Sequence, residues 1–237
     1  MTTLYLYGIT RPRRVPKRLS DRGISLVRHG ALAAIVSPID ASPVEASRRN
    51  LLAHADVVEE LHTGATVLPA RFGIVLPGRE AVRDDLLEAG SDEFERLLEE
   101  HRDTAELTLK ASYDESVLAE VTGGLGRLRQ AYARAPTLEN GMALGEAVAE
   151  ALARRRAGDA ERILSTLRPL ALDVRVGDPV DAHGLVNLAF LVERGRVETF
   201  SARLDELGAR LSPPARFKLI GPLPPYSFVD LRTPVAA

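Results

Sequence analysis

The sequence lacks cysteine and tryptophan altogether, and it has few lysines among its 31 basic residues. The absence of cysteine excludes disulfide frameworks, thiol catalysis and thiolate metal sites. No apolar run approaches the roughly 18 to 20 residues of a membrane-spanning helix, and Met1 leads directly into strand-like sequence without the apolar core of a signal peptide. We therefore expect a cytoplasmic protein that does not enter a membrane.

The sequence also has no large excess of charge of either sign. The 237 residues carry 33 acidic and 31 basic side chains, a formal net charge of -2. This balance argues against the bulk electrostatics of a general nucleic-acid binder, although it leaves a local basic patch open. The length suits two modest domains, each with its own core.

The first hundred residues mix short strands with one clear helix. Residues 4–7 alternate aliphatic and aromatic side chains, and residues 24–29 and 31–37 flank Gly30, so we predict three strands, the last two joined by a tight turn. Ser42-Pro43-Val44-Glu45 has the residue types of a helix start. The helix that follows carries an apolar stripe at steps of three and four residues, formed by Leu51, His54, Val58 and Leu61.

The second half has a regular order of elements. Residues 105–111 alternate as a half-buried strand, and a long helical region follows, with a break or a kink expected near Gly158. Residues 170–176 predict a strand with Leu172 and Val176 among its inward positions. Further patterns indicate a strand, a helix and a final strand at 216–220. The order strand, helix, strand, strand, helix, strand is that of the split βαβ or ferredoxin-like arrangement.

We therefore predict an α+β fold with two domains. Residues 1–103 form a separate mixed α+β domain at the N-terminus. Residues 104–237 form a ferredoxin-like domain that ends in a proline-rich tail.

Known catalytic patterns are missing: there is no phosphate-binding loop, no Gly-x-Ser-x-Gly elbow, no His-Glu-x-x-His and no dinucleotide fingerprint. His54 and His62 lie eight residues apart on one predicted helix, about 12 Å along its axis, too far to share a metal ion. We predict no catalytic residue, no cofactor and no metal site, with His54 a core histidine. The enzyme alternative pairs His54 or His62 with Asp56 or Glu59 in acid-base chemistry.

A nucleic-acid-binding regulator is the third hypothesis. It draws on the ferredoxin-like order, on the arginines of residues 11–18 and on the run 154–156. Neither basic segment is interleaved with aromatic residues, and the strand at 105–111 lacks the exposed rings that RNA-binding versions of this fold use. Solvated basic surfaces are the favoured interpretation, so we expect no nucleic-acid partner.

Two segments are harder to explain as ordinary loops. Residues 67–73 end a strand at a proline and then place Arg71, Phe72 and a glycine in succession, which can aim a guanidinium from a rigid turn. Residues 221–228 form a proline-rigidified extended segment. Its candidate residues are Pro222, Pro224, Pro225, Tyr226 and Phe228. Such a segment docks on a partner or back on its own domain at low entropic cost, and both readings stay open.

The chain resembles the GvpL/GvpF family of gas vesicle proteins. The likeness covers residues 4–9, 32–37 and 67–73, the helix with Leu51, Leu52, His54, Val57 and Val58, and residues 221–228, so it spans nearly the whole chain. One departure is Leu223, since the family commonly has an aromatic residue between these prolines.

The resemblance implies a minor structural or accessory protein of gas vesicle assembly with two α+β domains and no enzyme activity. It also implies a location in the cytoplasm and at the gas vesicle. The implied partners are the small hydrophobic protein of the gas vesicle shell and other accessory proteins.

Overall fold

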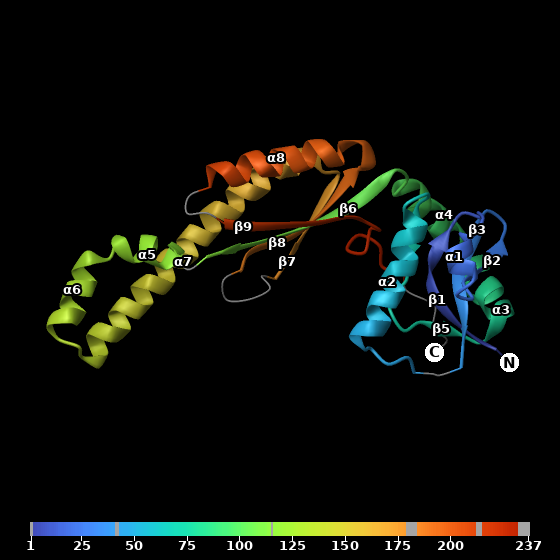
Figure 1. The fold of residues 1–237 in the computed structure, drawn as a ribbon, viewed down its shortest axis with the longest axis horizontal. Coiled ribbons are helices and arrows are strands. Elements are labelled where there is room, and N and C mark those ends of the chain that lie inside the picture. The colour runs from blue at the N-terminus through green and yellow to red at the C-terminus, as the bar shows by residue number, and fades with distance from the viewer. Residues whose placement is uncertain (1, 41–42, 115, 179–183, 212–214, 232–237) are drawn as a thin grey trace. The chain divides into compact units, whose positions relative to one another are not determined.

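The computed structural model describes residues 2–40, 43–114, 116–178, 184–211 and 215–231, which form a mixed α+β fold with two β-sheets (Figure 1). Contacts divide the chain into two units. Unit 1 consists of Met1–Glu106 and Gly221–Ala237, and unit 2 of Leu107–Ile220. The chain passes from unit 1 to unit 2 after Glu106, close to the domain boundary predicted at residue 103. Residues 221–237, which the sequence prediction places in the second domain, belong to unit 1 by their contacts, and Val229 and Leu231 lie in a core cluster of that unit.

Unit 1 contains a sheet with the strand order β2-β3-β1-β4, and β5 also pairs with β1. All of these pairs are antiparallel. The strands predicted at 4–7, 24–29 and 31–37 are present, and Gly30 between the last two has the positive φ of 53° that favours glycine. The elements of this unit are β1 (Thr3–Thr10), α1 (Lys17–Ser20), β2 (Ser25–His29), β3 (Leu32–Ile39), α2 (Arg48–His62), β4 (Val67–Pro69), β5 (Val75–Leu76), α3 (Gly78–Ala81), the π-helix η1 (Val82–Glu88) and α4 (Ser91–Glu100).

Strand β1 contains a β-bulge that sets the faces of its side chains. Its register with β3 shifts between Leu6 and Gly8, so Tyr7 is the extra residue. In a regular strand Leu6 and Ile9 would lie on opposite faces, but the bulge puts both in one buried cluster. Gly8 allows the close approach of β4, because a Cβ there would lie 2.4 Å from the carbonyl oxygen of Leu68.

The sheet of unit 1 has a buried cluster on each face. One cluster packs β1 and β3 against η1 and α4, and it includes Val229 and Leu231 from the C-terminal segment. The other packs the opposite face against α1 and α2, through Leu19, Val58 and Leu61. Unit 1 is therefore a three-layer structure with the sheet between two layers of helix.

Helix α2 begins later than the sequence predicts. Ser47 is the N-cap, and its side chain accepts a hydrogen bond from the backbone N–H of Asn50. The predicted start at Ser42 is wrong for the described residues: 43–47 are not helical, and Ser42 itself lies outside them. The non-helical stretch ends at this second, competing cap, and it borders the pocket described below.

Unit 2 contains a sheet with the strand order β7-β8-β6-β9, and β7 pairs antiparallel with β8. Helices α7 and α8 cover one face, burying Ile163, Leu167, Phe200 and Leu204. The apolar row predicted for residues 105–111 is buried as expected, but Glu106 of the polar row is buried as well. Its elements are β6 (Thr104–Tyr113, which begins in unit 1), α5 (Ser116–Gly123), α6 (Gly126–Arg134), α7 (Leu138–Leu167), the 3-10 turn η2 (Arg168–Leu170), β7 (Asp173–Gly177), β8 (Gly184–Glu193), the 3-10 turn η3 (Arg194–Arg196), α8 (Val197–Arg210) and β9 (Ala215–Leu223).

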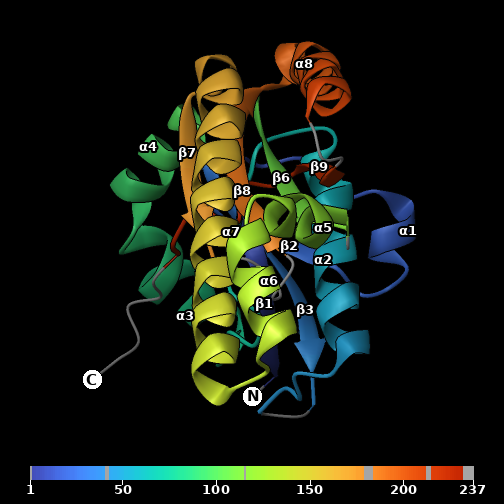
Figure 2. The same cartoon turned by 90° about the vertical axis from the view of Figure 1, so that its left-hand side faces the viewer.

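Helix α7 runs without interruption for 30 residues, so the break predicted near Gly158 is wrong. One glycine costs a helix only about 1 kcal/mol relative to alanine, which tertiary packing readily offsets. Its N-terminal half lies beside α6 (Figure 2). No side chain in residues 118–158, all of which are described, is fully buried.

Strand β7 is an edge strand, and its side chains are more exposed than predicted. Leu172, just before it, is 57% exposed and Val176 is 74% exposed, whereas both were predicted to point inward. Of this row, Leu170 and Val174 are packed against the core cluster. An edge strand has a neighbour on one side only, so alternation does not guarantee cover for its apolar row.

Across the described parts of the chain, no helix combines the length and the apolar composition that spanning a bilayer requires.

Candidate functional site

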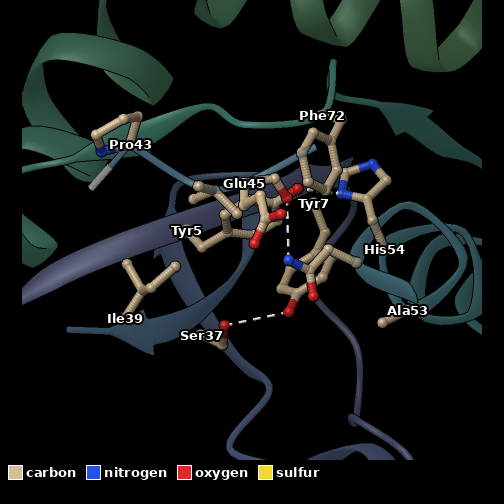
Figure 3. A pocket seen from close by; sticks show the side chains of 11 residues that line it. Tyr5, Tyr7, Ser37, Ile39, Pro43, Glu45, Ala53, His54 and Phe72 are labelled. Atoms are coloured by element: carbon tan, nitrogen blue, oxygen red, sulfur yellow. Dashed lines mark hydrogen bonds between the residues drawn. The ribbon is translucent and has the colours of Figure 1, made fainter. Parts of the chain in front are cut away.

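Unit 1 contains a pocket of about 400 Å³ between β1, the start of α2 and the turn after β4. Figure 3 shows the side chains around it. The lining residues are Tyr5, Tyr7, Ser37, Ile39, Pro43, Val44, Glu45, Asn50, Ala53, His54 and Phe72. The pocket thus joins one of the two motifs singled out by sequence, through Phe72, to the helix that carries His54.

Four aromatic rings meet at this pocket. Tyr7 stacks on His54 with ring centroids 5.5 Å apart, and Tyr5 meets Tyr7 edge to face at 4.8 Å. Phe72 contacts both Tyr5, at 6.0 Å, and His54, at 5.8 Å. Edge-to-face and offset pairs are the favoured ring geometries, so the four rings form a preorganised wall.

The hydrogen bonds of His54 fix the tautomer of its neutral ring. Its Nε2 lies 3.2 Å from the carbonyl oxygen of Ala70, which can only accept, so Nε2 carries a proton. Its Nδ1 then accepts from the hydroxyl of Tyr5 at 2.8 Å, and that hydroxyl in turn accepts from the backbone N–H of Gly73 at 3.2 Å. This chain ties β1, α2 and the turn at 70–73 together.

The electrostatics of the chain agree with a neutral imidazole. Burial lowers the pKa of His54, an effect that the hydrogen bond to Ala70 opposes in part. Burial also raises the pKa of Tyr5 to about 12. Both groups are therefore uncharged near neutral pH, and each serves as a fixed hydrogen-bonding partner of the other.

This arrangement predicts an acid-sensitive unit 1. Between the lowered pKa of folded His54 and the ordinary value of about 6.5, the unfolded chain binds more protons, so stability falls as the pH drops below about 6.5. His101, whose pKa burial also lowers, adds an effect of the same sign. Urea unfolding at pH 7.5 and 5.5, followed by hydrogen exchange of β1 and α2, should show this loss. The loss should be smaller in His54→Gln, and an unchanged pH dependence in that variant would contradict the prediction.

The structure gives His54 and Asp56 different partners. Asp56 pairs with Arg22 at 2.6 Å and with Arg18 at 3.4 Å, while both nitrogens of His54 are occupied as described. The His54–Asp56 pair of the enzyme hypothesis is therefore not formed. The other two residues of that hypothesis are His62 and Glu59. His62 is buried, and burial raises the pKa of the Glu59 carboxyl. The described residues hold no group of three or more His, Asp or Glu side chains placed to bind a metal ion.

The basic segments of the nucleic-acid hypothesis are largely offset by neighbours. In unit 1, Arg11 pairs with Glu99, Arg18 with Asp56 and Glu60, and Arg13 donates to the carbonyl oxygen of Leu61. On α7, Arg154 pairs with Glu150, and Arg155 with Glu120 and Asp159. These contacts favour the solvated, locally neutralised surfaces that the sequence indicates.

Arg71 and Phe72 point to different surroundings. Phe72 belongs to the ring wall, whereas the Arg71 side chain is 74% exposed and its Nη2 lies 2.8 Å from Oδ1 of Asp230. Asp230 follows the proline-rich segment, so the structure brings the two sequence motifs together through this pair. An exposed ion pair of this kind contributes little stability, about 0–1 kcal/mol.

The C-terminal segment is anchored mainly by buried groups. The backbone N–H and the hydroxyl of Ser227 donate to the two carboxylate oxygens of Glu106, at 2.7 and 2.8 Å, and Glu106 is only 3% exposed. Val229 and Leu231 lie in the core of unit 1. Tyr226 packs against the other core cluster, and burial, reinforced by two nearby carboxylates, raises its pKa. We call residues 224–231, with Glu106, the C-terminal clasp.

The remaining predicted site residues divide between the core and the surface. Pro224 and Pro225 are buried, Phe228 is half-buried, and Pro222 is exposed near the end of β9. Leu223, the departure from the family pattern, is half-buried as the last residue of β9.

Several functional residues escaped sequence reasoning. Glu106 sits at an outward position of an alternating strand, which normally indicates solvent exposure, and its partner lies 121 residues away. Glu45 was assigned to a helix start and lines the pocket instead. Among these residues only Tyr5 and Tyr7 could be linked from the sequence, because two residues that are two positions apart in a strand lie on the same face.

The comparisons with known proteins agree with the sequence resemblance. A family model described as "Gas vesicle synthesis protein GvpL/GvpF" matches residues 3–230. Gas vesicle protein F of Streptomyces sp. (strain CB03234) is 39% identical over 242 residues, covering 95% of this chain and 99% of that protein. Gas vesicle protein F of Dolichospermum flosaquae is 27% identical, covering 96% and 98%.

The fold is likewise similar to a solved structure. The crystal structure of the gas vesicle protein GvpF from Anabaena sp. PCC7120 superposes with a TM-score of 0.84 at 25% identity, covering 98% of this chain and 100% of that one. The family match over most of the chain and the full-length relatives confirm what the motifs of residues 4–9, 67–73 and 221–228 indicate. The chain belongs to the GvpL/GvpF family of gas vesicle proteins.

Proposed function

We propose that this chain is a non-enzymatic minor structural protein of gas vesicle assembly that contacts the hydrophobic major shell protein. The observation that carries the proposal is the family match over residues 3–230, with relatives named as gas vesicle proteins aligned along nearly their whole length. Family membership indicates an accessory role in gas vesicles, and the contact with the shell protein is the proposed step. In this proposal the protein works in the cytoplasm and at the gas vesicle, with other accessory proteins as further partners and no nucleic acid or membrane among them.

The state of His54 supports the non-enzymatic part of the proposal. A general base needs a free nitrogen within reach of a substrate, and both nitrogens of this buried ring are already engaged. His54, the first acid-base candidate of the sequence analysis, therefore has a structural role: its hydrogen bonds hold β1, α2 and the turn at 70–73 together.

The exposed edge of unit 2 supports a contact with an apolar partner. A very apolar shell subunit aggregates before assembly unless another surface covers it, and an open strand edge can do so by adding a strand of the partner. Strand β7 is such an edge in the described structure, and it carries the exposed side chain of Val176, with the exposed Leu172 just before it.

Co-expression with the major gas vesicle shell protein tests this function. We expect the two proteins to co-purify, and Val176→Lys on the β7 edge to reduce the recovered shell protein about tenfold, because a lysine on an edge strand opposes strand addition. Ala202→Lys is the matched control, since it places the same charge on the exposed face of α8 in the same unit.

Three outcomes are informative. Equal loss in both lysine variants would mean that charge, and not the edge, is responsible. No co-purification of the unmodified chain with a soluble shell protein would contradict the proposed contact. Arg71→Ala should leave co-purification unchanged, because Arg71 pairs with Asp230 of the C-terminal clasp and we do not assign it to a partner surface.

We further propose that unit 2 is a ferredoxin-like domain. Two observations support this assignment. The chain order of strand, helices, two strands, helix and strand is the predicted one. In the sheet, the first and third of the four strands, β6 and β8, are the central neighbours.

A further inference from the structure

The pocket of unit 1 has one wall of aromatic rings that is rigid before any ligand arrives. Tyr5 and His54 are locked by the hydrogen-bond chain to Ala70 and Gly73, and the hydroxyl of Tyr7 is bonded to that of Ser37 at 3.2 Å. The face of an aromatic ring carries the negative part of its quadrupole. Because these hydrogen bonds fix the rings, that negative face is fixed in the wall of the pocket.

The pocket also has one charge. Of its lining residues, Glu45 is the only one with a carboxylate side chain, and none is a lysine or an arginine. The Glu45 side chain is exposed, and within the described structure its carboxylate forms no ion pair. Its backbone carbonyl oxygen accepts from the side-chain amide of Asn50 at 3.0 Å, which fixes the chain at the pocket rim.

Aromatic faces and a single carboxylate together select a cation. A cationic group within about 6 Å of a ring face is attracted by its quadrupole, and a flat guanidinium can stack on a ring while donating to a carboxylate. An acidic group would be repelled by Glu45. A purely apolar side chain would desolvate that carboxylate without giving it a partner.

We propose that this pocket binds the guanidinium of an arginine side chain on a partner protein, with Tyr7 and Phe72 as the stacking surface and Glu45 as the hydrogen-bond acceptor. This inference rests on the proposed function, which supplies the partner as another gas vesicle protein. It gives Phe72 a role in binding, and it separates that role from the role of Arg71 in the C-terminal clasp.

The chemistry of the pocket is tested with small probes on the full chain. N-acetylarginine methylamide is titrated while the NMR signals of Tyr7 and Phe72 are recorded, and N-acetylcitrulline methylamide, of the same shape but neutral, is titrated in parallel. We expect the arginine probe to bind at least about fivefold more tightly than the citrulline probe. Glu45→Gln should remove this preference, whereas Glu95→Gln on the exposed face of α4 should leave it intact.

Equal binding of the two probes, a preference unchanged in Glu45→Gln, or no saturable shift with either probe would overturn the inference. The co-expression experiment keeps its failure distinct from that of the proposed function. If the chain co-purifies with the shell protein but its pocket ignores arginine, only the pocket assignment fails. If the pocket selects arginine but no gas vesicle protein co-purifies, the choice of partner fails with the proposed function.

Discussion

Replacing Glu106 by alanine is expected to release the C-terminal clasp and to lower the free energy of unfolding of unit 1 by about 3–5 kcal/mol. The substitution removes both acceptors of Ser227 at once, so the backbone N–H and the hydroxyl of Ser227 lose the buried carboxylate that holds this segment. It also opens a cavity at a position that is only 3% exposed. Val229 and Leu231 then lose the anchor that precedes them in the chain.

Hydrogen exchange read by mass spectrometry measures this effect segment by segment. Peptides from residues 224–231 should lose protection in Glu106→Ala, together with peptides from η1 and α4, which share a core with Val229 and Leu231. Glu106→Gln should retain most of the stability, because its amide can still accept from the N–H of Ser227 and donate to its hydroxyl. Asp230→Ala, which breaks only the exposed pair with Arg71, should change stability by about 1 kcal/mol or less. A clasp still protected in Glu106→Ala would show that the apolar contacts alone hold it.

In unit 2 the largest effect is expected for Asp159→Ala, a loss of about 2–4 kcal/mol. Asp159 is 3% exposed, and its Oδ2 accepts from the hydroxyl of Tyr113 and from Nε of Arg155, both at 2.7 Å. Its removal leaves the buried Tyr113 hydroxyl without this partner. It also uncouples α7 from β6, because this network joins the helix to the strand.

Urea unfolding followed by hydrogen exchange of β6 and α7 provides the measurement. Arg154→Ala, one turn away on the same helix, breaks only an exposed pair with Glu150 and serves as the control, with an expected change of about 0.5 kcal/mol or less. Asp159→Asn should be intermediate, since it keeps an acceptor for Tyr113 but loses the charge that Arg155 faces. Equal stability of the alanine and wild-type proteins would mean that the network is replaced by other contacts.

Much of the fold follows from local patterns in the sequence. The apolar row of residues 105–111 depends on neighbours within a few residues, and so does Gly30 between the β patterns at 24–29 and 31–37. The strands predicted there are present. The predictions that failed depend on competition. The start of α2 was placed at Ser42, but Ser47 provides the cap that is used. The break at Gly158 was outweighed by the packing of α7.

The candidate site was less accessible to sequence reasoning because its contacts are long-range. The sequence identified His54, Phe72 and the proline-rich segment separately, but nothing local indicates that Tyr5 bonds to His54, 49 residues away. The same holds for Glu106, whose polar character predicted solvent exposure. Family resemblance supplied the functional class, whereas the pocket and the clasp required the arrangement of elements in space.

The route of the chain through the two units has a consequence for the order of synthesis. Unit 1 uses segments on both sides of unit 2, so all of residues 107–220 leave the ribosome before Ser227 can reach Glu106. Domains generally begin to fold as they emerge, and here the inserted unit is complete while the first still lacks Val229 and Leu231. The apolar side chains of unit 1 that share a cluster with Val229 and Leu231 therefore lack these two partners until translation has passed residue 231. The core of unit 1 can therefore be completed only after the whole of unit 2 has been synthesised.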